Sequence, residues 1–135
     1  MKPTSVLETC LYVNDLETAE EFYRNVLGLE FVSRLQGRHV FLRCGDGVFL
    51  LFNPDRTADS KSVPSHGAHG PGHVAFAMDE TEITAWQERL REHGVEIEQE
   101  INWPSGDYSL YFRDPAGNSL ELATPKLWRG VSKAA

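Results

Sequence analysis

The pattern of hydrophobic and polar positions predicts a strand, a helix and three further strands in the first half of the chain. Strand-type residues occur at 7–13, near Phe31 and Val32, at 38–44 and at 48–52. Residues 15–27 instead show an apolar helical stripe, formed by Leu16, Ala19, Phe22, Tyr23 and Val26. Asp15 is placed to cap this helix and Gly28 to end it. This order predicts a βαβββ unit.

The second half of the chain repeats the order. A helix is predicted at 81–93, ending before Gly94, and strands are predicted at 73–78, 95–98, 108–113 and 119–123. Three pairs of landmarks have similar spacings: Gly28 and Gly94 are 66 residues apart, Glu8 and His73 are 65 apart, and Gly47 and Gly117 are 70 apart. We infer a duplicated βαβββ module and an α+β fold class.

The two modules are expected to form one domain over residues 1–135, with module one at about 7–54 and module two at about 71–128. Residues 53–72 lack periodicity and are rich in Ser, Pro, Gly, His and Asp, so they are predicted to be a linker. His66 and His69 lie in this linker. We interpret them as flexible loop residues, because glycine raises the entropic cost of fixing metal ligands.

Strand parity predicts which side chains share a face of a sheet. On three strands, the face away from the helices carries one potential metal ligand each: Glu8, His73 and Glu121. Alone, Glu8 is more simply a solvated strand residue, but together the three favour a site. A pseudo-twofold between modules would bring them together, with Glu121 equivalent to Leu51. One imidazole and two carboxylates suit a divalent ion, and Mn²⁺, Fe²⁺, Ni²⁺, Co²⁺ and Zn²⁺ all stay open.

Composition and charge limit the kinds of binding partner that are expected for this protein. The formal charge of −7 arises from 13 basic and 20 acidic residues spread along the chain, without a basic cluster that could follow a phosphate backbone. No segment has the character of a signal peptide or a membrane span, so we expect a soluble, cytoplasmic protein without nucleic-acid or membrane partners. Cys10 and Cys44 are expected to be buried free thiols rather than a disulfide.

Several segments resemble the vicinal-oxygen-chelate superfamily of glyoxalases, bleomycin-resistance proteins and ring-cleaving dioxygenases. In module one these segments are residues 11–16 and 22–29, and in module two they are residues 72–76 and 111–122. The segment 111–122, with the sequence YFRDPAGNSLEL, is the most specific for the family. The resemblance covers about residues 7–128. It implies paired modules that form an open, cup-shaped mixed β-sheet around one divalent metal ion, usually in a homodimer. The family ligand positions then fall on Glu8, His73 and Glu121.

Some departures from the family bear on activity. The first ligand position is often His or Gln in the family but is Glu8 here, and the ring-cleaving dioxygenases use two histidines and one carboxylate. A four-ligand glyoxalase I would have a glutamate where this chain has Leu51. Residues 106–112 resemble a stretch of the fosfomycin-thiol transferases, which also usually supply two histidines. Three protein ligands leave open coordination positions, as catalysis requires.

Parity also predicts the surroundings of the site. If the repeat alignment holds, the ligand side carries His39, Phe41, Arg43, Ser109, Tyr111 and Arg113, and Phe49 and Trp103 add walls. Such a pocket suits a small anionic or aromatic substrate. The plainer alternative for the two arginines is pairing with acidic loop residues such as Asp46 and Asp114.

Together these features favour a metal-dependent enzyme that acts on a small oxygen-bearing substrate. A glyoxalase-like lyase or isomerase comes first and a dioxygenase second. Glu8 is the candidate base, and Tyr111 is the candidate hydrogen-bond donor to the substrate. The alternative is a metal-free binding protein of the bleomycin-resistance type, whose cleft would need no carboxylates.

Overall fold

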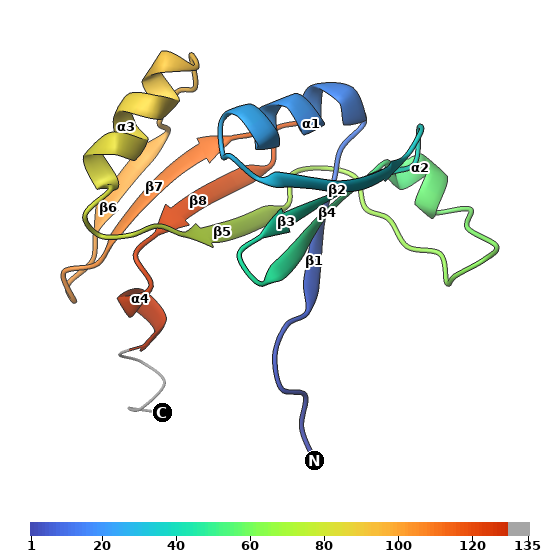
Figure 1. Ribbon diagram of the computed structural model, residues 1–135, viewed down its shortest axis with the longest axis horizontal. Coiled ribbons are helices and arrows are strands. Elements are labelled where there is room, and N and C mark those ends of the chain that lie inside the picture. The colour runs from blue at the N-terminus through green and yellow to red at the C-terminus, as the bar shows by residue number, and fades with distance from the viewer. Residues whose placement is uncertain (130–135) are drawn as a thin grey trace. The chain divides into compact units, whose positions relative to one another are not determined.

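The computed structural model describes residues 1–129 of the chain. The chain divides into two compact units between Gly72 and His73. Each unit contains a four-stranded mixed sheet and a helix of ten residues, which lies against one face of its sheet (Figure 1).

The first unit has the strand order β1-β4-β3-β2. β1 pairs with β4 in parallel, and the other neighbours pair antiparallel. Its elements are β1 (Glu8–Tyr12), α1 (Leu16–Asn25), β2 (Glu30–Leu35), β3 (His39–Cys44), β4 (Gly47–Phe52) and the short helix α2 (Pro54–Thr57).

The second unit has the order β5-β8-β7-β6, again with one parallel pair, β5 with β8. Its elements are β5 (His73–Ala77), α3 (Ile83–Glu92), β6 (Gln99–Asn102), β7 (Tyr108–Arg113), β8 (Ser119–Ala123) and the short helix α4 (Lys126–Arg129). Strand for strand, this connectivity repeats that of β1 to β4. The α+β fold and the duplicated βαβββ module are therefore confirmed.

The predicted signals at the ends of α1 are also confirmed. The Asp15 side chain accepts a hydrogen bond from the backbone N–H of Thr18 at 3.1 Å, and Gly28 adopts φ +71° just beyond the helix. The buried face of α1 presents Ala19 and Tyr23 to the sheet. The ring of Tyr23 lies 5.1 Å from that of Phe49, which is 2% exposed.

One predicted strand is wrong: pairing with β7 involves Gln99–Asn102 and not residues 95–98. The backbone N–H of Val95 donates to the carbonyl of Leu90 at 2.8 Å, so Val95 closes the end of α3. The first bond to β7 comes from the N–H of Glu98, which donates to Tyr111 O at 2.7 Å. The alternating hydrophobic pattern at 95–98 arises because Val95 and Ile97 are half-buried, although these residues do not form a strand.

The predicted linker is more ordered than expected. Asn53 caps α2, which begins with Pro54, and the backbone N–H of His66 donates to Thr57 O at 3.1 Å. The His66 imidazole is fixed as well, because its Nδ1 lies 2.6 Å from the hydroxyl of Tyr12. His66 is therefore attached to the first sheet rather than flexible.

The turns that join the last two strands of each module differ in length. In module one, Cys44 pairs with Gly47 across a tight turn. In module two, the N–H of Asp114 donates to the carbonyl of Asn118 at 3.1 Å, and Gly117 lies inside the turn with φ +92°. Asn118, and not Gly117, thus takes the position of Gly47.

This difference changes one predicted equivalence. In the register of the parallel pairs, Cys10 is opposite Leu50, and Ala75 is opposite Glu121. Leu50 is therefore the counterpart of Glu121, and the prediction of Leu51 is wrong by one residue. Leu51 is fully buried. The counterpart is a leucine in either case, so module one has no carboxylate at this position.

Two further expectations concern thiols and membranes. Cys10 and Cys44 are both free thiols, as predicted, although both are half-buried rather than fully buried. Burial raises the pKa of the Cys44 thiol. Within residues 1–129, no helix combines the length and hydrophobicity that a membrane span requires.

Candidate functional site

His73 and Glu121 lie close together in the second unit. His73 is the first residue of β5, and Glu121 is in the middle of the neighbouring β8. His73 Nε2 lies 3.3 Å from Glu121 Oε2. Two ligand atoms that are each about 2.1 Å from one metal ion, at angles of about 90–109°, lie about 3.0–3.4 Å apart. The pair therefore has the separation of two ligands of one ion.

The imidazole of His73 is oriented for this role. Its Nδ1 lies 3.0 Å from the carbonyl oxygen of Ser119. A carbonyl can only accept a hydrogen bond, so Nδ1 is the donor, and in the neutral imidazole Nε2 is then the nitrogen that offers a lone pair to a metal ion. A hydrogen bond of this kind on the second ring nitrogen is a regular feature of histidines that bind metal.

The carboxylate of Glu121 is held by hydroxyl groups of β7. Oε1 accepts hydrogen bonds from Ser109 Oγ at 2.6 Å and from the Tyr111 hydroxyl at 3.0 Å. Glu121 is 7% exposed and Ser109 is fully buried. Burial, followed by the neighbouring Glu121, raises the pKa of Tyr111. The two oxygens of Glu121 thus have different surroundings, because Oε1 is hydrogen-bonded and Oε2 faces His73.

The predicted wall residue Trp103 joins this network. Its indole N–H donates to Ser109 Oγ at 2.9 Å. Trp103 lies at the start of the turn between β6 and β7, where its backbone N–H donates to Asp107 O at 2.8 Å. The Asp107 side chain in turn accepts hydrogen bonds from Ser105 at 2.7 Å and Thr124 at 2.8 Å.

The structure brings two of the three predicted metal ligands close together, His73 and Glu121. Glu8 is the first residue of β1 in the other unit, where it is exposed and opposite Val48. No group of three or more His, Cys, Asp or Glu side chains that could hold a metal ion occurs among residues 1–129. The part of the predicted triad that lies within one unit is the pair His73 and Glu121.

Two of the predicted substrate residues of module one, His39 and Phe41, belong to an aromatic cluster on the face of the sheet opposite α1. The rings of His39 and Phe41 stack at 4.0 Å, and each meets Phe52 edge-on at 5.8 Å. Arg38 Nη1 lies 2.7 Å from His39 Nδ1, and its guanidinium is 5.4 Å from the Phe52 ring. Burial, and then the charge of Arg38, lowers the pKa of His39.

Sequence analysis missed Tyr12 and His66 as members of this cluster. The His66 ring lies 4.8 Å from Phe52 and 5.8 Å from Tyr12. Tyr12 shares the strand parity of Glu8, so parity places it on this face, although it was not among the predicted site residues. No periodic signal could have identified His66, because it lies on a loop.

The predicted wall residue Phe49 belongs to the opposite face. It packs against Tyr23 of α1 and is buried in the core of the first unit. Parity predicts the same result, because Phe49 lies one residue from Leu50, whose counterpart is Glu121. Phe49 is thus a core residue and not part of the ligand-side face.

The two predicted arginines differ. Arg113 donates to Glu98 from Nε at 2.9 Å and Nη2 at 3.2 Å, and to the carbonyl of Gly117 from Nη1 at 3.0 Å. Its carboxylate partner is thus Glu98 and not Asp114. Arg43 is exposed on β3, opposite Val48 of β4.

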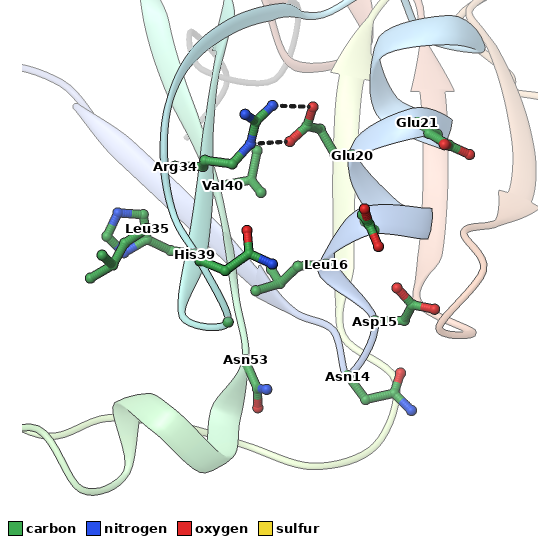
Figure 2. Close-up of a pocket in the computed structure, with 13 residues that line it drawn as sticks. Asn14, Asp15, Leu16, Glu20, Glu21, Arg34, Leu35, His39, Val40 and Asn53 are labelled. Atoms are coloured by element: carbon green, nitrogen blue, oxygen red, sulfur yellow. Dashed lines mark hydrogen bonds and ion pairs between the residues drawn. The ribbon is translucent and has the colours of Figure 1, made fainter.

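A separate groove of about 610 Å³ lies between α1 and the β2–β3 hairpin (Figure 2). Four carboxylates line it: Asp15, Glu17, Glu20 and Glu21. Glu20 accepts two hydrogen bonds from Arg34, at 2.9 and 2.8 Å, and these are the main reason that the pKa of Glu20 is lowered. Of the predicted site residues, only His39 borders this groove.

Comparison with known proteins identifies the family. The sequence profile of the Glyoxalase/Bleomycin resistance protein/Dioxygenase superfamily matches residues 5–122. The chain belongs to this superfamily. A solved relative is a lactoylglutathione lyase from Agrobacterium tumefaciens, with 44% identity and a TM-score of 0.90 over 94% of this chain and 98% of that one.

Other members of the superfamily are similar at lower identity. The metallothiol transferase FosB of Staphylococcus epidermidis is 29% identical over 94% of this chain and 86% of its own length. The catechol-2,3-dioxygenase of Bacillus subtilis is 28% identical over 83% of this chain but only 38% of its own length. These three relatives are named as enzymes, which supports the conclusion that this chain is an enzyme of the superfamily.

Proposed function

We propose that this protein is a metal-dependent enzyme that acts on a small oxygen-bearing substrate by glyoxalase-like proton transfer, as a lyase or isomerase. One observation carries the proposal. His73 Nε2 and Glu121 Oε2 lie 3.3 Å apart, while His73 Nδ1 and Glu121 Oε1 are already hydrogen-bonded elsewhere. The similarity to a lactoylglutathione lyase, at 44% identity, supports the reaction class.

His73 and Glu121 would hold one divalent ion, drawn from Mn, Fe, Ni, Co or Zn. Glu8 is the proposed third ligand, from module one of the same chain or of a second copy in a homodimer. When bound, the ion would stabilise negative charge that develops on the substrate oxygens.

The two glutamates are suited to different roles. Glu121 is buried and its Oε1 is held by Ser109 and Tyr111, so it is suited to remain a ligand. Glu8 is exposed, and among residues 1–129 no hydrogen bond or ion pair restrains its carboxylate. Glu8 is therefore the ligand that is also proposed as the base: its carboxylate would detach and take a proton from a substrate carbon. Tyr111 is the proposed donor to the substrate oxygen: its single hydroxyl proton would turn from Glu121 Oε1 to the substrate, while Ser109 keeps its own bond to Oε1.

The proposed substrate contacts come from both modules. The stacked pair of His39 and Phe41 offers an apolar surface that can exclude water. Arg43 is better suited than Arg113 to bind an acidic group of the substrate, because the guanidinium of Arg113 is occupied by Glu98. Ser109 and Trp103 contribute through their hydrogen bonds to the Glu121 network.

A second candidate is the transfer of a thiol to a small electrophile. The similarity to FosB, which extends over 94% of this chain, supports this activity. Ring cleavage by oxygenation has less support, because the chain spans only 38% of the dioxygenase relative.

The test begins with protein purified without a chelating column. Elemental analysis should find a bound divalent ion, and metal-reconstituted protein should turn over hemithioacetals in preference to thiol–epoxide pairs and catechols. Glu8→Gln should lower turnover by about 10²–10⁴-fold per bound metal ion, which is the usual contribution of a general base. Glu17→Gln on the surface of α1 is the matched control.

Turnover that persists after complete metal removal would contradict the metal-dependent reaction. Turnover per bound metal that Glu8→Gln leaves unchanged would remove Glu8 as the base. Tight binding of a small molecule by metal-free protein, without turnover, would instead indicate a binding protein of the bleomycin-resistance type.

A further inference from the structure

We infer that Trp103 and Ser109 are positioning residues that make Glu121 bind metal through one oxygen, Oε2. This inference rests on the proposed metal centre. It assigns a role to two residues that do not belong to the proposed ligand set. Both lie in the second unit with Glu121, so their arrangement depends on one sheet.

The hydrogen bonds from Trp103 to Glu121 can run in only one direction. An indole N–H can only donate, and an ionised carboxylate can only accept. Ser109 lies between them, 2.9 Å from Trp103 Nε1 and 2.6 Å from Glu121 Oε1. Because its oxygen accepts from Trp103, its single proton is directed to Glu121.

The result is an unequal pair of carboxylate oxygens. Oε1 receives the short bond from Ser109 and a second bond, of 3.0 Å, from Tyr111. Bonds to an ionised oxygen are about twice as strong as neutral ones. A rotation that turned both oxygens toward a bound ion would break both bonds, in a region where Ser109 is fully buried. Oε2 therefore stays directed at His73, at 3.3 Å.

The turn that carries Trp103 is itself attached to the strand of Glu121. The backbone N–H of Trp103 donates to Asp107 O at 2.8 Å, and the Asp107 side chain accepts from the hydroxyl of Thr124 at 2.8 Å. Thr124 directly follows β8, which carries Glu121. The indole is thus held in a fixed place relative to the carboxylate that it orients.

The first measurement is the affinity of metal-free protein for Co²⁺ and Zn²⁺ by calorimetry. Ser109→Ala should weaken binding by about 10–100-fold, as the loss of an outer-shell partner commonly does. Trp103→Phe should cause a smaller loss in the same direction, because it leaves the Ser109 hydroxyl free to rotate. Trp86→Phe on α3 is the control and should bind as the wild type does.

The second measurement is the visible absorption spectrum of each variant saturated with Co²⁺. The spectrum of Ser109→Ala should differ from that of the wild type, because the released Oε1 can join the coordination. Ser109→Thr, which keeps a hydroxyl, should restore the wild-type spectrum. A purely structural role for Ser109 would lower thermal stability without changing the spectrum.

The two hypotheses fail separately. Wild-type protein that binds no divalent ion overturns the proposed function and this inference with it. Wild-type binding with unchanged affinity and spectrum in Ser109→Ala overturns the inference alone. If Ser109→Ala does not fold, Trp103→Phe decides: unchanged affinity and an unchanged Co²⁺ spectrum overturn the inference.

Discussion

His73 Nε2 and Glu121 Oε2 lie 3.3 Å apart although the two residues are 48 positions apart in the chain. The parallel pairing of β5 with β8 causes this proximity, because it sets Ala75 opposite Glu121 and His73 two residues away on the same face. A buried carboxylate and a half-exposed imidazole are thereby presented together from two rigid strands.

Replacement of Glu121 should separate metal binding from folding. We expect Glu121→Ala to lose stoichiometric binding of divalent ions, measured by elemental analysis after dialysis. Glu121→Gln should also lose most binding, but it should be more stable than Glu121→Ala, because its amide oxygen can still accept from Ser109. Undiminished metal binding in Glu121→Ala would exclude this residue as a ligand.

Phe49 and Phe41 should respond differently to truncation. Phe49→Ala should cost about 3–5 kcal/mol of unfolding free energy, because it opens a cavity under α1. It should leave the metal affinity of the folded protein unchanged. Phe41→Ala, on the opposite face, should lower the unfolding free energy by less. Urea titration of both variants measures the two losses. Equal losses for both variants would contradict the assignment of these rings to different faces.

His39 should titrate below the ordinary value of 6.5, because burial and then Arg38 lower its pKa. The neutral imidazole is therefore favoured by folding. Its contribution to stability is complete above pH 6.5 and is lost as the pH falls through the folded-state pKa. NMR titration of the imidazole should show this directly, and Arg38→Gln should raise the pKa only part of the way, because burial remains. A pKa at or above 6.5 in the wild type would refute the prediction.

Asp114 should be important for the turn before β8. Its Oδ1 accepts from the backbone N–H of Ala116 at 3.0 Å and of Asn118 at 2.9 Å, and its Oδ2 accepts from the Asn118 side chain at 2.9 Å. Asp114→Ala should cost about 1–3 kcal/mol in urea denaturation, because it leaves buried donors unsatisfied. Asp114→Asn is the matched variant, since it keeps the acceptor for the backbone, and it should cost less. Equal stability of the two would show that the backbone contacts contribute little.

Sequence pattern was most informative where one face of a strand is fully buried. The predicted strands at 108–113 and 119–123 coincide with β7 and β8, and Glu121 stands out because a carboxylate occurs between Leu120 and Leu122, which are almost fully buried. At Val95 the hydrophobic pattern was misleading, because closure of a helix and pairing of a strand bury similar residues.

Register was less predictable than element type. Glu121 was wrongly predicted to be the equivalent of Leu51 because Gly47 was equated with Gly117. The turns that contain these two glycines differ in length. A single-residue error of this kind moves a side chain to the other face of a sheet. The hydrogen bonds of Ser109 depend on the same cross-strand register, so parity could place it on the right face but not identify its partners.

The attachment of His66 to Tyr12 divides the segment between the modules into two parts with different tolerance to insertion. Residues 58–65 form a closed surface loop between Thr57 and His66, whose backbones are joined by a 3.1 Å hydrogen bond. Residues 67–72 form the tether from His66 to module two, and within it His69 Nε2 lies 3.5 Å from Asp55 Oδ1. Extra residues in the closed loop would add only a small closure entropy, since this cost grows slowly with length. The same residues inserted after His66 would lengthen the tether itself, so position 62 is a better place for a tag or a reporter than position 69.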